Sequence, residues 1–297
     1  MKTKVCSVGE CMVEIINDKD NSYFQSYAGD TFNFSVYLSR LNFKIDYLTA
    51  IGKDEFSKNF VKFAEKENIS SKLIHIDNNK IIGLYIVKSK KNGEKKFFYW
   101  RDNSAAKKFF NNLDSKYIIS KLKSYQYIYF SGITLSLIED KHQKLFYRII
   151  NTLKRDNIKV IFDINIRKPR WKNSSTLNKT LNYYLPLVDI LFATGEDMLQ
   201  WKNNNSLSKF TKIIHTNKIQ HAIYRLNVEK NYVFINNKIY KSNNKRHKTI
   251  VNSAGAGDGF NAHYIATFFK TNNVNLALKQ GHNIGSKIVK HRSAIIP

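Results

Sequence analysis

Cysteine, proline and long apolar runs are all scarce in this chain, and each scarcity argues against a class of protein. Among 297 residues there are two cysteines, Cys6 and Cys11, and three prolines. The two cysteines lack the second pair that a zinc site requires, so we interpret them as small buried thiols. A reducing cytoplasm is the simplest environment for such a chain.

Long apolar segments are missing as well. No run approaches the roughly 20 apolar residues that a membrane-spanning helix needs. Near the N-terminus, Glu10 and Glu14 interrupt the short apolar stretch in which a signal peptide would need its core. We therefore expect neither a membrane partner nor export, and the sequence contains no internal repeat and no low-complexity linker.

Acidic residues are few. The chain has 23 Asp and Glu against 49 Lys and Arg, which gives a formal net charge of +26 at pH 7. A charge of this size attracts nucleic acid non-specifically. However, Lys, Asn, Ile, Phe and Tyr are abundant together, which is the pattern that AT-biased coding produces, and the basic residues are spread along the chain. We interpret the charge as compositional drift and expect no specific nucleic-acid partner.

The order of the apolar segments predicts an α/β fold. With 42% hydrophobic residues the chain can bury a large core, as one α/β domain or two small ones. From Tyr125 onward, short apolar runs alternate with helical spacing, which is typical of a mostly parallel sheet covered by helices on both faces. Such folds bind ligands at the ends of their strands. The predicted strands are 4–10, 45–51, 126–130, 160–163, 190–193, 221–225 and 232–235, and the predicted helices include 56–67, 141–155 and 260–269.

A predicted hairpin interrupts this alternation. Segments 81–88 and 95–100 flank Lys91-Asn92-Gly93, and Asn-Gly is a strong turn signal. Together with the exposed strand 22–28, the hairpin is expected to form a small separate sheet. We expect this sheet to act as a lid, made of about residues 11–32 and 82–102, on a single domain of residues 1–297.

The most informative stretch is Asn252–Phe260, which reads Asn-Ser-Ala-Gly-Ala-Gly-Asp-Gly-Phe between a predicted strand end at 248–251 and a predicted helix. Gly255 and Gly257 permit unusual backbone angles and close approach. The first amides of a helix have no internal partner and carry partial positive charge, so they bind anions such as a phosphoryl group. Asp258 is then either a general base for an attacking hydroxyl or an ordinary helix N-cap.

Gly255-Ala256-Gly257-Asp258 with Phe260 resembles the anion-hole signature of the ribokinase-like carbohydrate kinases. The resemblance implies a three-layer α/β/α sandwich with a β lid. It also implies that the amides of Gly255, Ala256 and Gly257 stabilise the transferring phosphoryl group while Asp258 activates a sugar hydroxyl. Many members have Asp-Thr where this chain has Asn252-Ser253, so a hydroxyl is kept and a charge is lost.

Further segments are similar to one branch of that family, the 2-keto-3-deoxygluconate kinases, and they follow the same order over nearly the whole chain. The resemblance implies transfer of the γ-phosphoryl group of ATP to the terminal (6-) hydroxyl of a sugar acid, giving 2-keto-3-deoxy-6-phosphogluconate, with Mg²⁺ accompanying the nucleotide. The matching segments are Val8–Met12, Gly29–Asn33, Phe98–Arg101, Tyr129–Ile133, Phe162–Arg167 and Ala294–Pro297.

The same resemblance assigns expected roles to individual residues. A sugar acid needs a cation, and Arg101 and Arg167 follow a hairpin and a strand, where a guanidinium could hold a carboxylate; taken singly, each could instead form a structural ion pair. The expected substrate-binding residues are Gly29, Asp30, Asn33, Tyr85, Tyr99, Arg101, Arg167 and Asp258, although Asp30 and Asn33 could also be helix caps. The expected ATP-binding residues are Asn165, Arg225, Gly255, Gly257 and Asn283.

Two departures from the family pattern concern the metal and the nucleotide. Glu196 matches the acidic position of a metal-associated Asn-x-x-Glu segment and would act through water, but Ala193 replaces the Asn. Leu226 stands where relatives usually have glycine in the turn beside the nucleotide. These departures leave two alternatives to a kinase of sugar acids, namely another sugar kinase such as a fructokinase or a decayed, non-catalytic sugar-binding protein. The resemblance also suggests a homo-oligomer in which lids meet.

Overall fold

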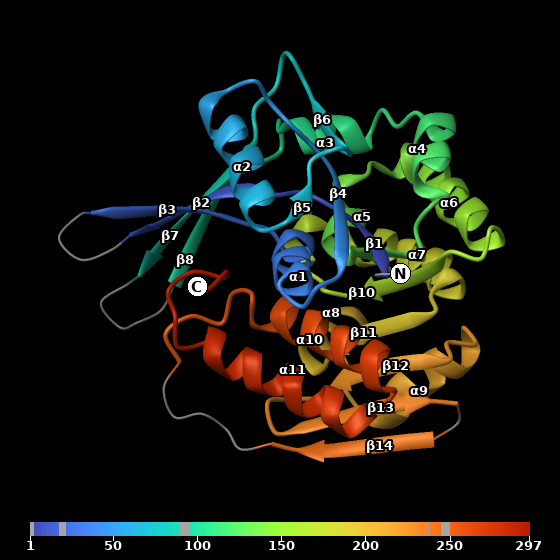
Figure 1. Cartoon of the computed structure of the whole chain (residues 1–297). Helices are drawn as coiled ribbons and strands as arrows, with labels where there is room; N and C mark the ends of the chain where they lie inside the picture. The colour runs from blue at the N-terminus through green and yellow to red at the C-terminus, as the bar shows by residue number, and fades with distance from the viewer. Residues whose placement is uncertain (1–2, 18–21, 90–94, 237, 245–249) are drawn as a thin grey trace.

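A computed structural model describes residues 3–17, 22–89, 95–236, 238–244 and 250–297. The elements form two sheets with helices on both faces of the larger one (Figure 1). The strands are β1 Lys4–Val8, β2 Met12–Asn17, β3 Tyr23–Ala28, β4 Lys44–Ile51, β5 Ile69–Ser70, β6 Ile74–Ile76, β7 Gly83–Ser89, β8 Lys95–Trp100, β9 Tyr127–Ser131, β10 Lys159–Asp163, β11 Ile190–Thr194, β12 His221–Arg225, β13 Lys230–Ile235 and β14 Lys238–Asn243. The helices are α1 Asp30–Ser39, α2 Glu55–Lys66, α3 Ala105–Phe110, α4 Ser115–Leu122, α5 Gly132–Leu137, α6 Asp140–Arg155, α7 Ser174–Tyr184, α8 Gly195–Lys202, α9 Leu207–Thr216, α10 Ala256–Thr271 and α11 Val274–Ile288, with short 3₁₀ turns at Lys168–Arg170 and Leu185–Leu187.

The large sheet has the order β14-β13-β12-β11-β10-β9-β1-β4-β5, and β6 also pairs with β4. Its strands run parallel from β12 to β5, whereas β13 and β14 are antiparallel additions at one edge. The chain leaves β1 toward β4 on one side and later returns to β9 on the other. This reversal of strand order beside β1 is where folds of this type form a ligand crevice.

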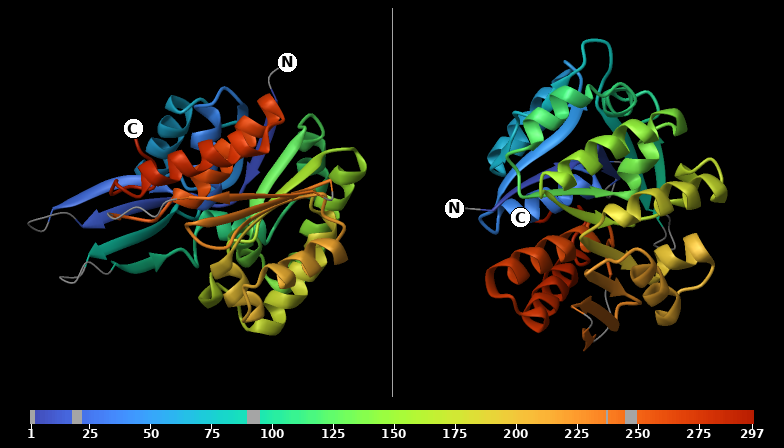
Figure 2. Two further views of the ribbon diagram at one scale, coloured as in Figure 1. Left: turned by 90° about the horizontal axis from the view of Figure 1, so that it is seen from below. Right: turned by 90° about the vertical axis from the view of Figure 1, so that its right-hand side faces the viewer.

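Alternation along each strand builds two apolar layers. In β10, Val160 and Phe162 join the cluster with α4 to α9, whereas Ile161 joins the cluster with α1, α2, α10 and α11. Burying both faces of a strand is what a parallel sheet covered by helices requires. Figure 2 shows these two helical layers on opposite sides of the sheet, which confirms the predicted three-layer arrangement.

The second sheet has the order β3-β2-β7-β8 and projects from one side of the molecule (Figure 1). It joins the predicted strand 22–28 to the predicted hairpin, so the small sheet is confirmed; the turn Lys91-Asn92-Gly93 lies outside the described residues. Residues 30–32, which we assigned to the lid, begin α1, where Thr31 and Phe32 are buried and Asp30 is partly exposed.

Most predicted strands and helices occur within one or two residues of their expected limits, and two expectations at the glycine-rich stretch need correction. Helix α10 begins at Ala256 rather than at Phe260. The predicted strand end at 248–251 is wrong for Ile250 and Val251, which are exposed and not part of a strand, while 248 and 249 lie outside the described residues.

Candidate active site

The predicted site residues gather at the carboxyl ends of the parallel strands. Asn165 and Arg167 follow β10 and Arg225 ends β12, and Glu10, which the sequence did not single out for the site, follows β1. Helix α10 starts beside these strand ends, because the guanidinium of Arg225 lies 3.1 Å from where a side chain on Gly257 would begin. The topology therefore brings segments that are distant in sequence to one edge of the sheet.

The start of α10 depends on Gly255. This residue is the N-cap, with φ of 77° in the left-handed region, and a side chain there would collide with the carbonyl oxygen of Ala294. No side chain caps this helix by a hydrogen bond, and Asp258 lies inside its first turn. The N-cap alternative for Asp258 is therefore wrong, and the amides at the helix start are available to an anion, except that Ala256 donates to Ser253 at 3.3 Å.

The side chain of Asp258 is buried and held by a residue from α1. Asn33 Nδ2 donates to Asp258 Oδ2 at 2.8 Å. Burial and the charge of Asp30 raise the pKa of Asp258 to about 7, against the opposing effects of the Asn33 hydrogen bond and of Arg167 and Arg225. A carboxyl group with this pKa can both accept and release a proton near neutral pH.

The segment Gly29–Asn33 lies next to this carboxylate. Gly29 is the N-cap of α1, and no side chain caps the helix, so the interpretation of Asp30 as a cap is wrong. Asn33 Oδ1 accepts from the Gly29 amide at 3.4 Å, and Asn165 Nδ2 donates to Asp30 Oδ2 at 2.8 Å. The structure therefore brings Gly29, Asp30, Asn33, Asn165 and Asp258 together.

The two predicted arginines differ in their surroundings. Arg167 is exposed, and its Nη1 donates to the Ile166 carbonyl at 2.9 Å. Burial raises the pKa of Asp30 and that of Asp258, and the charge of Arg167 opposes both shifts. Arg101 is buried and forms an ion pair with the buried Glu10. Arg101 therefore has a buried acidic neighbour, as the alternative interpretation anticipated, whereas Arg167 is exposed and acts on Asp30 and Asp258 through its charge.

The small sheet contributes the two predicted tyrosines. Tyr85 and Tyr99 face each other across β7 and β8, with ring centroids 5.6 Å apart. Tyr85 is buried and its hydroxyl donates to Glu14 on the neighbouring strand β2, whereas Tyr99 is 51% exposed. The Arg101 guanidinium lies 5.6 Å from the Tyr99 ring centre, so Tyr99 marks the side of the sheet that faces the site.

The expected nucleotide residues are only partly brought together. Arg225 reaches the start of α10, with its guanidinium 4.8 Å from the Phe260 ring centre, and its Nε is buried with no hydrogen-bond partner in the described part of the chain. Leu226 does not block this placement, since its carbonyl packs against Gly195 at the start of α8. Asn283 is exposed on α11.

Glu196 is exposed in the first turn of α8, where its Oε1 accepts from Gln200 at 3.1 Å. Within the described ranges, no group of three or more His, Cys, Asp or Glu side chains is placed to hold a metal ion. A single exposed carboxylate fits a Mg²⁺ ion that arrives on phosphate oxygens and keeps its waters, but not a resident metal in a protein cage.

Sequence reasoning missed several polar residues around the site. Asp163 at the end of β10 is buried and accepts from Asn261 Nδ2 at 2.9 Å, and burial raises its pKa well above the usual value. Asp197 accepts from the amide of Ile166 at 2.8 Å and so fixes the loop that carries Arg167. For Asp163 the available signal was a polar residue within or directly after an apolar strand, which also marks Glu10, whereas Asp197 lies inside α8 and had no such signal.

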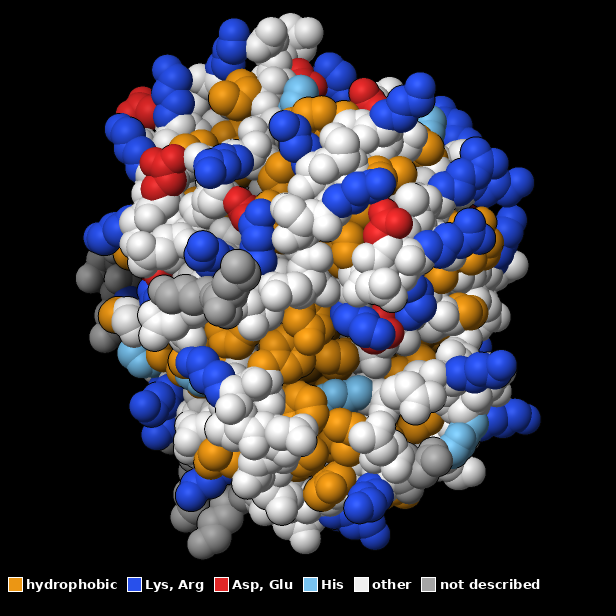
Figure 3. Space-filling model, turned by 45° about the vertical axis from the view of Figure 1, so that its right-hand side comes forward, with side chains coloured by type: hydrophobic (Ala, Val, Ile, Leu, Met, Phe, Trp, Pro, Cys, Tyr) orange, Lys and Arg blue, Asp and Glu red, His pale blue; other side chains and the backbone are white. Residues whose placement is uncertain are grey.

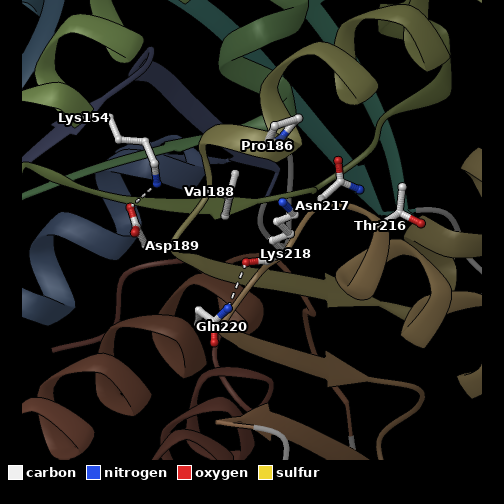
Figure 4. A pocket seen from close by; sticks show the side chains of 8 residues that line it. All are labelled: Lys154, Pro186, Val188, Asp189, Thr216, Asn217, Lys218 and Gln220. Atoms are coloured by element: carbon white, nitrogen blue, oxygen red, sulfur yellow. Dashed lines mark hydrogen bonds and ion pairs between the residues drawn. The ribbon is translucent and has the colours of Figure 1, made fainter.

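A cavity of about 390 Å³ lies elsewhere, at the opposite end of the strands (Figure 4). Asp189 and Gln220, which line it, directly precede β11 and β12. Lys154 Nζ already pairs with Asp189 at 3.0 Å. This cavity is therefore separate from the predicted site.

Parallel α/β proteins that bring helix-start amides and a carboxylate to one sheet edge form a class that binds phosphate-bearing ligands there. Within that class, residues 2–297 match the pfkB family carbohydrate kinases, and the chain belongs to that family. Membership implies a carbohydrate kinase that uses ATP.

Individual relatives resemble the chain along its whole length. A 2-dehydro-3-deoxygluconokinase of Dickeya dadantii is 29% identical over 307 residues, covering 100% of this chain and 98% of the relative. The protein of the same name from Escherichia coli K12 is 27% identical, with the same coverage. The crystal structure of a 2-dehydro-3-deoxygluconokinase from Thermotoga maritima has a TM-score of 0.84 at 18% identity, covering 99% of this chain and 96% of that one.

Helix length and surface charge bear on which larger partners the chain could have. Across the described ranges, no helix combines the length and apolar character needed to cross a bilayer. Lys and Arg side chains are scattered over the face shown in Figure 3.

Proposed function

We propose that this protein transfers the γ-phosphoryl group of ATP to the terminal (6-) hydroxyl of 2-keto-3-deoxygluconate, also called 2-dehydro-3-deoxygluconate. The observation that carries the proposal is the hydrogen bond between Asn33 and Asp258. It joins the segment expected to bind the sugar to the residue expected to act as base, at the helix start expected to hold the phosphoryl group. Full-length relatives of that activity support the choice of sugar.

In the proposed reaction, Asp258 accepts the proton of the terminal hydroxyl while the hydroxyl oxygen forms a bond to the γ-phosphorus. The bond from that phosphorus to the bridging oxygen breaks, and ADP leaves with the electron pair. The amides of Gly255 and Gly257 and the nearby Arg225 guanidinium would stabilise the charge on the transferring group. This chemistry depends mainly on positioning and charge neutralisation, which fixed amides and a held carboxylate supply.

The substrate is proposed to lie between α1 and the small sheet. Asp30 and Asn33, which lie beside Asp258, would bind hydroxyl groups, and the exposed Arg167 would bind the carboxylate. Asn165 and Asn283 are proposed to contact the nucleotide, Asn165 from the loop after β10 and Asn283 from α11. Mg²⁺ enters bound to ATP as part of the substrate, and Glu196 would reach it through water.

The small sheet is proposed to close over the sugar as the lid of one kinase domain spanning residues 1–297. Closure would exclude water, which otherwise competes with the sugar for the phosphoryl group. Free, buried Cys6 and Cys11 suit a reducing compartment such as the cytoplasm.

The substrate proposal is tested by an ADP-coupled assay with MgATP and either 2-keto-3-deoxygluconate or fructose. We expect kcat/KM for the sugar acid to exceed that for fructose by at least about 100-fold, since the polar site groups would be left unpaired by a sugar that lacks the carboxylate. Equal or better turnover of fructose would identify a neutral-sugar kinase. Saturable binding of the sugar acid without ADP release would identify the non-catalytic alternative.

A further inference from the structure

Three aspartate–asparagine pairs join the elements that meet at the site. In each pair an asparagine side-chain amide donates a hydrogen bond to an aspartate carboxylate on a different element. Helix α1, helix α10 and the end of β10 with the loop after it each supply one aspartate and one asparagine, so the pairs close into a ring. The pairs and their N···O distances are Asn33–Asp258 at 2.8 Å, Asn165–Asp30 at 2.8 Å and Asn261–Asp163 at 2.9 Å.

Spacing along the two helices explains how each helix takes part in two pairs. Asp30 and Asn33 are three residues apart in α1, and Asp258 and Asn261 are three residues apart in α10. Residues at this spacing lie on one face of a helix. Each helix can therefore turn an acceptor and a donor toward two different neighbours.

Two of the three pairs contain residues with a role in the proposed reaction, and the third does not. Asp258 is the proposed base, and Asp30 and Asn33 are proposed to bind sugar hydroxyls. Asp163 and Asn261 are 3% and 0% exposed, so neither side chain is open to a substrate. Burial of a carboxyl group disfavours its charged form, so a buried aspartate away from the ligand needs another reason to be there.

The Asn261–Asp163 bond ties α10 to the central sheet one turn after the proposed base. No side chain caps the start of α10, and the bond between Asn33 and Asp258 joins this helix to α1 rather than to the sheet. Asn261 Oδ1 has no hydrogen-bond partner in the described part of the chain, so the side chain is held through its Nδ2. A shift of α10 would move the Asp258 carboxylate and the amides at the helix start together, and a displacement of about 1 Å can lower a rate about 100-fold.

We propose that Asp163 and Asn261 are positioning residues for phosphoryl transfer, because their hydrogen bond fixes the start of α10 against the end of β10. The bond thereby sets the place of Asp258 and of the amides that hold the phosphoryl group. Neither residue contacts the substrate or accepts its proton. This inference rests on the proposed function, since the position of α10 matters for turnover only if Asp258 is the base.

The first test compares Asn261→Ala with Asn111→Ala in the full chain, assayed with 2-keto-3-deoxygluconate and MgATP. Asn261→Ala should lower kcat by about 10-fold to 100-fold and leave both KM values within about threefold, because the contacts to sugar and nucleotide remain. Asn111 is also buried, but its side chain bonds to backbone atoms of Lys107, Leu137 and Glu139.

The control separates stability from positioning. Asn111→Ala should lose stability in urea titrations and keep kcat within about twofold of the wild type. If Asn261→Ala loses stability and likewise keeps kcat within about twofold, the bond is only structural and the positioning role is refuted.

The second test asks whether the bond or the charge of Asp163 matters. Asp163→Ala should match Asn261→Ala in kcat, and the double variant should lose no more than either single one, because all three break the same bond. Asp163→Asn keeps an acceptor oxygen for Asn261 and should recover most of the lost kcat. Losses that multiply in the double variant, or Asp163→Asn as slow as Asp163→Ala, would contradict the proposal. Asn261→Ser, whose side chain is too short to reach Asp163, replaces any alanine variant that does not fold.

The wild type separates this inference from the proposed function. If it phosphorylates fructose and not the sugar acid, the choice of substrate fails, and the same variants compared with fructose decide the positioning role. If it transfers phosphate to neither sugar, the proposed function and the positioning role both fail.

Discussion

At the scale of single residues, three aspartates lie close together in the site, and their mutual repulsion favours protonation. Asp258, Asp30 and Asp163 are close enough for each charge to act on its neighbours. Burial favours the protonated form of each, and Asn33 and Asn165 supply the hydrogen bonds that partly offset this. The result for Asp258 is a proton acceptor poised near neutral pH, which is where a general base works best.

The raised pKa of Asp258 predicts a pH dependence of catalysis. Because the base must be ionised, kcat/KM for the sugar acid should rise with pH and level off above about 7. Initial rates from pH 5 to 9 at low sugar concentration and saturating MgATP measure this. A profile that is flat between pH 5 and 8 would contradict the assignment.

The same shift predicts how stability changes with pH. A carboxyl group whose folded pKa lies above its unfolded value contributes stability that is fully present below the unfolded pKa and is lost as pH rises through the folded one. The free energy of unfolding of the wild type should therefore fall relative to that of Asp258→Asn between about pH 4 and pH 7, because the asparagine cannot ionise at this position. Urea titrations of both proteins at each pH provide the comparison, and a constant difference would count against a raised pKa.

The sequence predicted some of these residues and not others for a physical reason. Asp258 and Asn33 could be predicted because each sits in a short local motif at a helix start. The ion pair of Arg101 with Glu10 could not, because Arg101 follows β8 of the small sheet and Glu10 follows β1 of the large sheet, and only the folded chain brings the two together. Which cation is compensated depends on topology, and local spacing carries no information about it.

At the scale of elements, the periodic spacing of apolar residues predicted the long helices and the central strands. It did not predict the short elements. Strands β5 and β6 and helix α3 contain two, three and six residues, too few to establish a period. The first turn of α10 was missed because Ala256–Gly259 has no apolar face, although tertiary contacts hold it in a helix. Turn chemistry and not periodicity determines where that helix begins.

Substitutions at Gly255 and Gly257 should distinguish what the start of α10 needs in order to fold from what it needs in order to transfer a phosphoryl group. Gly255→Ala should lower the free energy of unfolding by about 1–3 kcal/mol, because φ of 77° is unfavourable for alanine and its methyl group meets the Ala294 carbonyl. Gly257→Ala should fold normally, since its nearest neighbour is the movable Arg225 guanidinium at 3.1 Å, yet it should impair phosphoryl transfer. Urea unfolding combined with the kinase assay measures both; equal stability losses would contradict this division.

At the scale of the whole molecule, the last residues of the chain help to build the site. The Tyr37 hydroxyl donates to Ala294 and accepts from the amide of Ile296 at 3.1 Å, which presses the C-terminal segment against Gly255. Asn252 Nδ2 donates to the Arg292 carbonyl, a bond that the aspartate common in the family could not donate. The departure at Asn252 is therefore used in the fold.

The exposed aromatic side chains of the small sheet lead us to propose a homo-oligomer. Phe24 on β3 and Phe97 and Trp100 on β8 are 40–58% exposed at the two edge strands of the small sheet, and exposed aromatic side chains are typical of association surfaces. Analytical ultracentrifugation at micromolar concentration should give a mass above that of one chain of 34.7 kDa. Trp100→Glu should shift the mass toward the monomer, and a wild-type monomer would exclude this role for the sheet.

The assignment of Asp258 as the base is tested most directly by single-turnover transfer from radiolabelled ATP to 2-keto-3-deoxygluconate, comparing the wild type with Asp258→Asn. The substitution keeps the shape of the side chain and an oxygen for Asn33, so both substrates should bind within about threefold of the wild type. The transfer rate should fall by about 100-fold to 10,000-fold. Transfer at the wild-type rate would contradict the account.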